Sequence, residues 1–241
     1  MLNAVFTSEK RHRKRTTPQI LIKIILCAGT VIMVFPFLWA LSVSLQGPGL
    51  TYLNPPHFFK PPYMFSNYRR VLEEANFLRY ALNSLFIAGV CIVGNVFSNS
   101  FIGFGFAKYK FKGVEVLFFT VLSTMMLPHN ILTIPVYIMW RWFGALDTYI
   151  PLTIPTFFGA AVNVFLMRQC FRSIPNELYE AALVDGAKPL WIFFKVYLPL
   201  AKPMLATIAV TTFMSSWNNM FGPLIYITTK SKYTISIGLL Y

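Results

Sequence analysis

Charged side chains are scarce in this 241-residue sequence. Asp, Glu, Lys and Arg make up 12% of it, against about 25% in ordinary soluble domains. Hydrophobic residues make up 56%, and so few charges cannot cover a surface that faces water. Intrinsic disorder is excluded as well, because it requires low hydrophobicity and high net charge. The remaining class is an integral membrane protein.

Acidic residues are the rarer sign of charge. The sequence has 8 Asp and Glu against 21 Lys and Arg, so that its net charge is +13. A basic chain can bind nucleic acid. Here the basic residues fall between long apolar runs and not along one stripe, which is typical of membrane topology. We therefore expect no nucleic-acid partner.

Cysteine and histidine are too few and too scattered for a metal site. The three cysteines contain no C-x-x-C pair, which argues against both a disulfide framework and a thiolate metal site. The three histidines form no local metal motif. A Gly-x4-Gly-Lys-Ser/Thr phosphate loop is also absent, so we expect no ATP bound by that route. The sequence therefore predicts no metal ligands, no bound cofactor and no catalytic residues.

Five runs without Lys, Arg, Asp or Glu reach the roughly 20 apolar residues that a membrane span requires. Backbone groups cannot remain unpaired in lipid, so each run predicts a helix and the fold class is an all-α polytopic bundle. The runs are 24–45, 80–107, 116–140, 148–167 and 203–229. The third run contains Pro128 and Pro135, so it either kinks or ends near Pro128.

Basic flanks set the expected orientation of these spans. With the N-terminus inside, 14 basic residues are cytoplasmic and 7 are external, which agrees with the excess of Lys and Arg on the cytoplasmic side. We therefore predict a cytoplasmic N-terminus, a basic N-terminal segment at 1–23 and a transmembrane domain at 24–241. The first run follows basic residues as in a signal peptide, but its apolar core is too long for one that is cleaved.

The segment 168–202, between the fourth and fifth runs, predicts a helix-turn-helix on the cytoplasmic face. Pro175 suits the first turn of a helix, and Glu177 and Glu180 favour its N-terminal end. Gly186 is a natural C-terminal stop, and a second, more apolar helix follows. From these residues alone, a docking role and a plain amphipathic loop at the membrane interface both remain open.

Within this segment several residues stand at fixed spacing: Glu180-Ala181-Ala182, Gly186, Val196 and Leu198-Pro199. The pattern resembles the EAA loop of binding-protein-dependent ABC importer permeases, EAA-x3-G-x9-I-x-LP, with Val196 in place of Ile. The resemblance implies that 168–202 is a coupling loop containing a coupling helix, which docks on a separate ATP-binding subunit. The residues that it assigns to ATPase coupling are Glu177, Glu180, Ala181, Ala182, Asp185, Gly186, Val196, Leu198 and Pro199.

Further motifs, spread over nearly the whole chain, resemble the carbohydrate branch of these permeases. They are Asn67-Tyr68, Asn83-Ser84, Ala107-Lys108-Tyr109, Ile134-Pro135-Val136-Tyr137, Leu146-Asp147-Thr148, Ile174-Pro175-Asn176-Glu177-Leu178, Trp217-Asn218 with Pro223, and Tyr233-Thr234 with Gly238-Leu239. The resemblance implies a permease subunit that forms the path for a sugar or oligosaccharide and has no enzymatic activity of its own.

The same resemblance implies partners and a location. The partners are a second, different permease subunit, two ATP-binding subunits that hold ATP and Mg, an extracytoplasmic solute-binding protein and the lipid of a bacterial-type inner membrane. Such permeases usually have six spans, whereas this sequence shows five. Two alternatives therefore stay open: an importer for another solute, such as a glycerol phosphate ester or an amino acid, and a truncated assembly subunit that does not transport.

Three residues of the fifth run are candidates for the solute path. Trp217 and Asn218 lie near its middle, and Asn219 follows. Asn is costly in lipid and is expected to face the interior of the bundle, while Trp usually prefers the membrane interface. We predict that Trp217, Asn218 and Asn219 line the path, where the indole can stack on sugar rings. The alternative is packing between helices.

Overall fold

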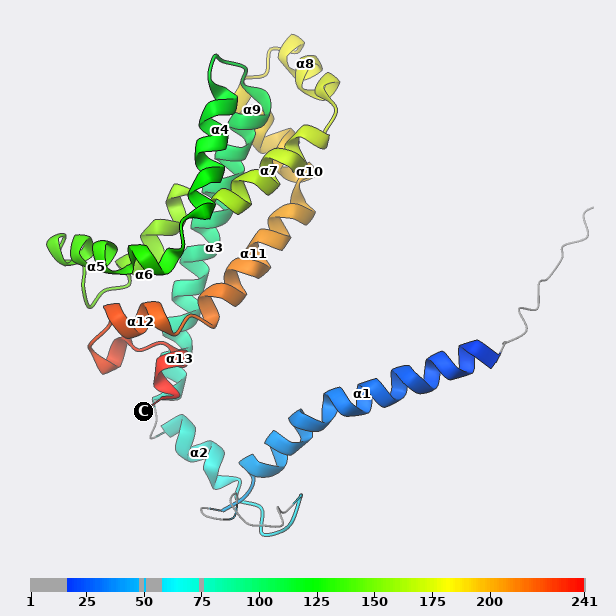
Figure 1. Ribbon diagram of the computed structural model, residues 1–241, viewed down its shortest axis with the longest axis vertical. Coiled ribbons are helices and arrows are strands. Elements are labelled where there is room, and N and C mark those ends of the chain that lie inside the picture. Colours follow the sequence, from blue (N-terminus) through cyan, green and yellow to red (C-terminus); the bar gives the residue numbers. More distant parts are fainter. Residues whose placement is uncertain (1–16, 48–49, 51–57, 74–75, 241) are drawn as a thin grey trace, which may run out of the picture. The chain divides into compact units, whose positions relative to one another are not determined.

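The computed structural model describes residues 17–47, 50, 58–73 and 76–240, and for residues 17–20, 129 and 130 it describes the backbone alone. Throughout these residues the regular structure is helical and no strand is present, which confirms the prediction of an all-α fold (Figure 1). The chain divides into two compact parts, unit 1 (Met1–Val71) and unit 2 (Leu72–Tyr241).

Unit 1 is built on one long apolar helix, α1 (Thr17–Ser44), which covers all but the last residue of the first predicted run. Its apolar stretch Leu21–Ser44 is long enough to cross a membrane, and none of the most apolar part is buried within the structure. A surface of this kind requires lipid or another protein around it. Residues 1–16 of the predicted basic segment lie outside the described residues.

Asn67 and Tyr68 close the C-terminal end of α1. Both belong to α2 (Ser66–Glu73). The side-chain amide of Asn67 donates to the backbone oxygens of Ser44 at 3.0 Å and Gln46 at 2.9 Å, and the Tyr68 hydroxyl lies 2.6 Å from the Ser44 hydroxyl. The last carbonyls of a helix have no partner within the helix, so these contacts satisfy groups that would otherwise be unpaired. The Asn67-Tyr68 motif thus holds the end of the first helix.

Unit 2 is arranged around α3, a helix of 32 residues (Figure 1) that is about 48 Å long at 1.5 Å per residue. In chain order, its elements are α3 (Phe77–Lys108), α4 (Val114–Ser123), the 3-10 helices η2 (Thr124–Met126) and η3 (His129–Leu132), α5 (Thr133–Trp142), α6 (Ile150–Thr153), the 3-10 helix η4 (Ile154–Phe158), α7 (Ala161–Ser173), α8 (Asn176–Val184), α9 (Pro189–Ile192), the π-helix η5 (Phe193–Tyr197), α10 (Leu198–Leu200), α11 (Lys202–Trp217), α12 (Phe221–Tyr226), the 3-10 helix η6 (Lys230–Lys232) and α13 (Ile235–Gly238).

Two glycines of α3 let its neighbours approach closely. The elements α7, α11 and η4 all pack along α3. At Gly94, a Cβ atom would come within 2.4 Å of the Thr156 hydroxyl oxygen, and at Gly103 within 2.6 Å of the Met167 Cβ atom. Helices in membranes commonly meet at small residues of this kind, because there is little hydrophobic driving force between them in lipid.

The third predicted run, 116–140, does not form one continuous helix. It is divided among α4, η2, η3 and α5. The helical part ends at Leu127, whose backbone is extended (φ −81°, ψ 117°), because the residue before a proline is driven out of the helical region. Of the two outcomes that Pro128 left open, the structure shows the helix ending there.

The helical part of the fourth run begins at Ile150, two residues after the predicted start, and it is not one regular helix either. Its elements α6, η4 and α7 together cover Ile150–Ser173, a stretch long and apolar enough to cross a membrane. Gly159, between η4 and α7, has a positive φ of 85°. The side-chain oxygen of the buried Asn99 accepts a hydrogen bond from the Ala160 backbone N–H at 2.7 Å, and this bond caps the start of α7.

The fifth run, 203–229, is also divided, so the prediction of one continuous span there is wrong. Helix α11 has 16 residues and ends at Trp217, and α12 starts at Phe221. On its other side α11 is bent by 78° from the preceding helical stretch Pro189–Leu200. Within the described residues three helices are long and apolar enough to span a membrane, or four if this bent pair counts as one. Five spans were predicted.

Candidate functional site

Helix α8 presents one face to the exterior and another to the body of unit 2. Glu177, Glu180, Ala181 and Val184 share the outer face, as their three- and four-residue spacing requires, and all four are exposed. Val184 is 88% exposed, which is unusual for an apolar residue in the middle of a motif. Tyr179 points inward, and burial raises the pKa of its hydroxyl.

Gly186 ends α8 with a paired set of hydrogen bonds. Its φ is +81°, a left-handed conformation that favours glycine. Its backbone N–H donates to the Leu183 carbonyl at 3.0 Å, and the Ala187 N–H donates to the Ala182 carbonyl at 2.9 Å. This is the Schellman pattern of helix termination. Ala182 and Ala187 also both pack against the same buried cluster, so the turn is fixed by contacts as well as by hydrogen bonds.

The start of α8 is tied to the end of α3. The Lys108 ammonium donates to the side-chain oxygen of Asn176 at 2.7 Å, and the same nitrogen lies 4.7 Å from the ring centroid of Tyr197. Ammonium groups are attracted to the faces of aromatic rings. The Ala107-Lys108-Tyr109 and Ile174-Pro175-Asn176 motifs, which are 65 residues apart or more, therefore meet at this joint.

Beneath α8 lies a cluster of fully buried apolar side chains, called the aromatic core here. Its members are Phe104, Met167, Phe171, Ile192, Phe193, Tyr197, Ala201 and Ile208. The Phe104 ring centroid lies 5.1 Å from that of Phe193 and 5.2 Å from that of Tyr197, within the range at which aromatic pairs attract. Because these residues come from α3, α7, η5 and α11 among others, the core joins all these elements near α8.

The residues assigned to coupling divide into two groups. Ala182, Val196 and Leu198 pack against the aromatic core. The remaining six are exposed: Glu177, Glu180, Ala181, Asp185, Gly186 and Pro199. The first group fixes the position of α8, and the second is accessible to a partner. The structure contains this chain alone and does not test whether the second group contacts a partner. The role of these residues in coupling therefore stays a prediction.

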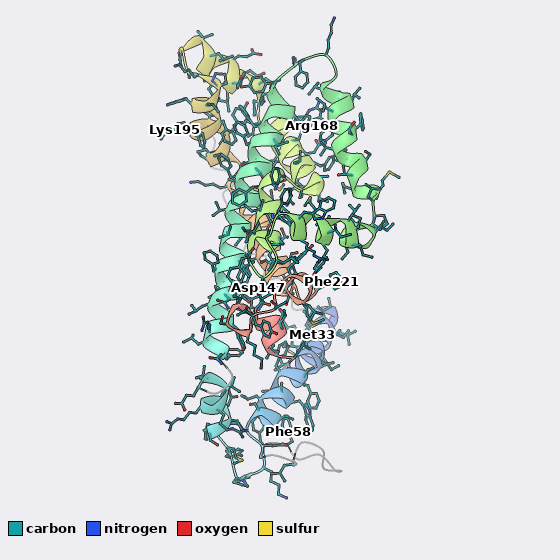
Figure 2. All side chains as sticks on the ribbon, turned by 90° about the vertical axis from the view of Figure 1, so that its left-hand side faces the viewer. Met33, Phe58, Asp147, Arg168, Lys195 and Phe221 are labelled. Atoms are coloured by element: carbon teal, nitrogen blue, oxygen red, sulfur yellow. The ribbon has the colours of Figure 1, made fainter. Side chains whose placement is uncertain are left out.

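Arg168, which the sequence marked only by its charge, is a structural residue of the same end. It is 4% exposed. Its guanidinium forms an ion pair with Glu115, donates to the Phe106 backbone oxygen at 3.3 Å and lies 3.8 Å from the Phe118 ring centroid. A charged side chain immediately after an apolar run was the signal that could have identified it. Figure 2 shows Arg168 and Lys195 toward this end of unit 2, and Asp147 and Phe221 toward the other.

Between the helices of unit 2 is a cavity of about 390 Å³, called the polar cavity here. It is lined by Ser84, Ile87, Cys91, Asn95, Leu152, Thr156, Ala160, Asn163, Thr211, Thr212, Ser215, Ser216, Asn219, Pro223 and Thr234. Ten of these residues carry a hydroxyl or a side-chain amide, and none carries a charge. The sequence did not predict this cavity, because its residues come from α3, α6, η4, α7, α11 and the segments after it.

Of the three residues predicted to line the path, only Asn219 lines the polar cavity. Its side-chain oxygen accepts from the Gly222 N–H at 3.0 Å and so caps α12. The Asn218 side chain donates to the Met214 carbonyl of its own helix at 2.8 Å. Trp217 stacks on Phe213 with 5.5 Å between ring centroids. Placing Trp217 and Asn218 in a path through the assembled protein therefore stays a prediction.

A second, apolar cavity of about 830 Å³ lies next to the first. It is lined by residues of α5, α6, η4 and α12, and it shares Leu152 and Asn219 with the polar cavity. Trp140 lines it and is 9% exposed, and the indole N–H of Trp140 has no hydrogen-bond partner within the described residues. The Asn219 side chain thus stands where a polar space and an apolar one meet.

At the end of unit 2 away from α8, Asp147 holds a loop together. Its carboxylate accepts from the backbone N–H groups of Thr228 at 3.0 Å and Thr229 at 2.9 Å, and from the Lys232 ammonium at 2.8 Å. The Lys232 ammonium, assisted by the Thr229 hydroxyl and the two backbone donors, holds the pKa of Asp147 well below its usual range. The Leu146-Asp147-Thr148 motif therefore anchors residues 227–232.

Asn83 and Ser84 hold the segment that follows. The Asn83 side chain donates to the backbone oxygens of Ser231 at 3.0 Å and Tyr233 at 2.9 Å, and the Ser84 hydroxyl accepts from the Ile235 N–H at 2.9 Å. The motifs Asn83-Ser84 and Tyr233-Thr234, 150 residues apart, are thus in direct contact. Most of the motifs that resemble those of permeases are joints between helices.

These features define a multi-pass membrane protein with an exposed helix-turn at one end and a polar cavity between its helices. Residues 99–240 match the family described as binding-protein-dependent transport system inner membrane component. The match covers more than half of the chain, and the chain belongs to this family. It is therefore a transport component and not an enzyme, as predicted.

Two curated relatives extend this result over most of the chain. The arabinooligosaccharides transport system permease protein AraQ of Halalkalibacterium halodurans is 32% identical over 199 residues, which are 82% of this chain and 70% of AraQ. The sn-glycerol-3-phosphate transport system permease protein UgpE of Escherichia coli K12 is 29% identical over 220 residues, which are 89% of this chain and 78% of UgpE.

A solved structure agrees with the fold of the chain. The crystal structure of a bacterial ABC transporter involved in the import of the acidic polysaccharide alginate contains a chain that is 29% identical, with a TM-score of 0.81. The likeness covers 98% of this chain and 82% of that one. The fold of the chain is therefore that of an ABC transporter permease, which confirms the predicted class.

Proposed function

We propose that this chain forms the membrane path of an ABC importer for a sugar or oligosaccharide and is coupled through α8 to a separate ATP-binding subunit. The observation that carries the proposal is the outer face of α8, which exposes Glu177, Glu180, Ala181 and Val184 on a helix held firmly from below. The name of AraQ as an arabinooligosaccharide permease supports the solute class.

The outer face of α8 has the composition of a docking surface. Val184, 88% exposed, is an apolar centre, and Glu177, Glu180 and Asp185 surround it with negative charge. Interfaces between subunits commonly combine an apolar centre with a polar rim. Ala181 adds no bulk, so a partner surface can approach the helix closely. The expected partner surface is a groove with an apolar floor and basic edges.

The aromatic core provides a stiff connection from α8 to the helices beside the polar cavity. Phe193 and Tyr197 of η5 are fully buried in it, together with Ile208 of α11. Close-packed interiors transmit a displacement as a rigid-body shift, because they have little free space in which to absorb it. Movement of α8 by a partner would therefore move α11, which lines the polar cavity through Thr211, Thr212, Ser215 and Ser216.

The proposal includes the predicted partners. A second permease subunit, two ATP-binding subunits carrying ATP and Mg, and an extracytoplasmic solute-binding protein would complete the importer. The family description names dependence on a binding protein, and an alginate transporter structure of the same fold was solved with a periplasmic protein that carries an alginate pentasaccharide. The proposal places the N-terminal segment 1–23 and the loop 168–202 in the cytoplasm, where ATP is available, and the transmembrane domain at 24–241.

An importer for a glycerol phosphate ester is the second candidate. UgpE is 29% identical to this chain, and its name specifies sn-glycerol 3-phosphate. Relatives with one fold can carry different solutes. The two candidates share the coupling loop and differ in the chemistry of the path.

The charge reversal Glu180→Lys tests the coupling role of α8. Glu180 is exposed, so the variant should insert and fold normally, while the new positive charge opposes a basic partner surface. Like charges that face each other across an interface weaken binding by several kcal/mol. For one such contact at a partly exposed site we expect about 2–4 kcal/mol. We expect solute-stimulated ATP hydrolysis by the reconstituted complex to fall at least tenfold, with the ATP-binding subunits lost during purification.

The matched control is Arg172→Glu, a charge reversal on an exposed residue of α7 outside the outer face of α8. It should retain both the ATP-binding subunits and the stimulation. Normal solute-stimulated ATP hydrolysis in Glu180→Lys would refute the coupling role of this face.

A further inference from the structure

We infer that the polar cavity is a subsite for a neutral solute rich in hydroxyl groups and that its chemistry disfavours anionic solutes. The inference rests on the proposed function and makes its solute class specific. It depends on three independent properties of the cavity. No charged residue lines it, some of its hydroxyl groups already donate their hydrogen to helix carbonyls, and one buried hydroxyl has no partner within the described residues.

The first property is that no Lys, Arg, Asp or Glu is among the residues that line the cavity. An ionised phosphate or carboxylate loses its hydration when it enters such a space, and without a cation or several strong donors nothing replaces that hydration. A sugar hydroxyl loses much less and can be matched by one neutral hydrogen bond. A cavity for a phosphate ester would be expected to contain Arg or Lys.

The second property is that two of the lining hydroxyls already donate their hydrogen to backbone carbonyls of the helices. The Thr156 hydroxyl donates to the Thr153 carbonyl at 2.6 Å, and the Thr211 hydroxyl donates to the Thr207 carbonyl at 2.9 Å. Their oxygens still have lone pairs, so toward the cavity they act as acceptors. A sugar hydroxyl can donate to such groups. Phosphate and carboxylate oxygens at neutral pH can only accept, so the same groups repel them.

The third property concerns Thr234. It is 4% exposed, lines the cavity, and its hydroxyl has no hydrogen-bond partner within the described residues. Its backbone is fixed, because its carbonyl accepts from the Gly238 N–H at 2.8 Å and the next N–H, of Ile235, donates to Ser84. A buried polar group without a partner is costly and is usually explained by something that it binds. A solute hydroxyl can serve this group as donor or as acceptor.

The cavity has the size expected for part of an oligosaccharide. Its volume of about 390 Å³ falls at the lower end of the range for small-molecule sites, about 300–1,000 Å³. The side-chain amides of Asn95, Asn163 and Asn219 lie around it together with the hydroxyls. Such a mixture offers many weak neutral hydrogen bonds and no strong one, which suits a solute that must enter and leave.

The sharpest test is Thr234→Val, which removes the hydroxyl and keeps the shape of the side chain. If the residue were only structural, removing an unpaired buried hydroxyl would leave the thermal stability of the complex unchanged or raise it and leave transport unchanged. If the hydroxyl binds solute, the solute concentration for half-maximal ATPase stimulation rises about 3- to 10-fold while stability holds. Thr207→Val is the matched control, since Thr207 is an exposed residue of α11 outside the cavity.

A labelling experiment tests the solute class directly on the detergent-solubilised complex without a binding protein. Cys27 and Cys170 are replaced by Ser, Cys91, which lines the cavity, is replaced by Ala so that no hydroxyl is added there, and Ser215→Cys places one thiol at the cavity. Lactose or an arabino-oligosaccharide should slow maleimide labelling at least threefold, while sn-glycerol 3-phosphate and an alginate oligosaccharide should not. Equal or better protection by either anion would overturn the inference, as would an unchanged response of Thr234→Val together with no protection by any sugar.

Failure of this inference and failure of the proposed function give different results. In the first case, neutral sugars stimulate ATP hydrolysis by the wild-type complex in the presence of its binding protein, but the cavity variants behave as wild type. This result would refute the subsite alone. ATP hydrolysis that no sugar or phosphate ester stimulates would refute the proposed function. If Thr234→Val proves less stable than the wild type, Ser215→Ala takes its place, because Ser215 is an exposed residue that lines the cavity. The same rise in the solute concentration for half-maximal ATPase stimulation is expected for Ser215→Ala.

Discussion

The two ends of unit 2 are held together by different forces. At the α8 end, buried rings and aliphatic side chains meet in the aromatic core, and the ion pair of Arg168 and Glu115 lies at the same end. At the other end, Asp147 and Asn83 hold the segment 227–235 through hydrogen bonds and one ion pair. Packing of the first kind is insensitive to pH and salt, whereas the second kind depends on the ionisation of one carboxylate.

This difference separates two mechanical roles. A close-packed core resists deformation, so the α8 end is suited to passing a movement from a partner into α11. Hydrogen-bonded loops can exchange partners with water at modest cost. The hydrogen bonds of Asp147 and Asn83 therefore fix the backbone of the segment 227–235 without the help of the aromatic core. Substitutions at each end should reveal the contrast in both the size and the pH dependence of their effects.

The largest effect is expected for Phe193→Ala at the α8 end. Phe193 is fully buried and contacts the rings of Phe104, Phe171 and Phe101. Removing a buried ring leaves a cavity and costs about 3–5 kcal/mol in well-packed interiors. Chemical or thermal unfolding of the detergent-solubilised complex should show this loss.

The neighbouring Phe194 is the matched control, because it lies on the same π-helix but is 47% exposed. Phe194→Ala should cost less than about 1 kcal/mol in the same assay. Equal losses for the two variants would mean that the aromatic core does not stabilise this end.

An intermediate effect is expected for Asp147→Asn at the opposite end. The neutral amide keeps the size of the carboxylate but loses the ion pair with Lys232 and weakens the bonds from Thr228 and Thr229. Since the group is partly exposed, solvent screens part of the loss. A decrease in the unfolding midpoint of about 2–4 °C at neutral pH is the expected result.

The pH dependence of Asp147→Asn separates the two ends further. A carboxylate whose folded-state pKa lies below its unfolded value stabilises the fold above the unfolded pKa of about 4, and this contribution is lost as pH falls toward the folded-state pKa. The stability difference between wild type and variant should therefore be full at neutral pH and shrink below about pH 4. A constant difference down to pH 3 would contradict the ionic nature of this contact. Phe193→Ala should show no such trend.

The sequence predicted features that depend on local signals. Pro175 and Gly186 bound α8 within one residue of the predicted limits, because proline and glycine act on the backbone where they stand. The division of the fifth run was not predicted. The helix breaks at residues 218–220, where neither proline nor glycine is present and Asn219 caps the next helix.

The polar cavity was beyond sequence reasoning for a different reason. Its hydroxyls and amides are scattered from Ser84 to Thr234, and each of them alone looks like a tolerated polar residue in an apolar helix. Only the packing of α7 and α11 on α3 brings them together. Arg168 was similarly hidden, since its partners Glu115 and Phe118 are 50 or more residues away. Both the polar cavity and the contacts of Arg168 are formed by residues that lie far apart in the sequence.

An effect on stability similar to that of Asp147→Asn is expected for Gly186→Ala, which tests how far the α8 end depends on a single turn. No atom lies within 4 Å of the position that a Cβ would take, so the substitution causes no collision. The cost arises from the φ of +81° alone, and it is about 1–2 kcal/mol for a residue with a Cβ in the left-handed region.

Gly105→Ala is the matched control. A Cβ added at Gly105 would also meet no atom within 4 Å, but Gly105 lies inside α3 without a positive φ, where alanine is favoured over glycine. Gly186→Ala should lower the unfolding midpoint by a few degrees and reduce solute-stimulated ATP hydrolysis severalfold, because a shifted turn reorients the outer face of α8. Gly105→Ala should do neither. If Gly186→Ala loses stability but keeps full stimulation, the turn serves only to end the helix, and the aromatic core alone sets the position of α8.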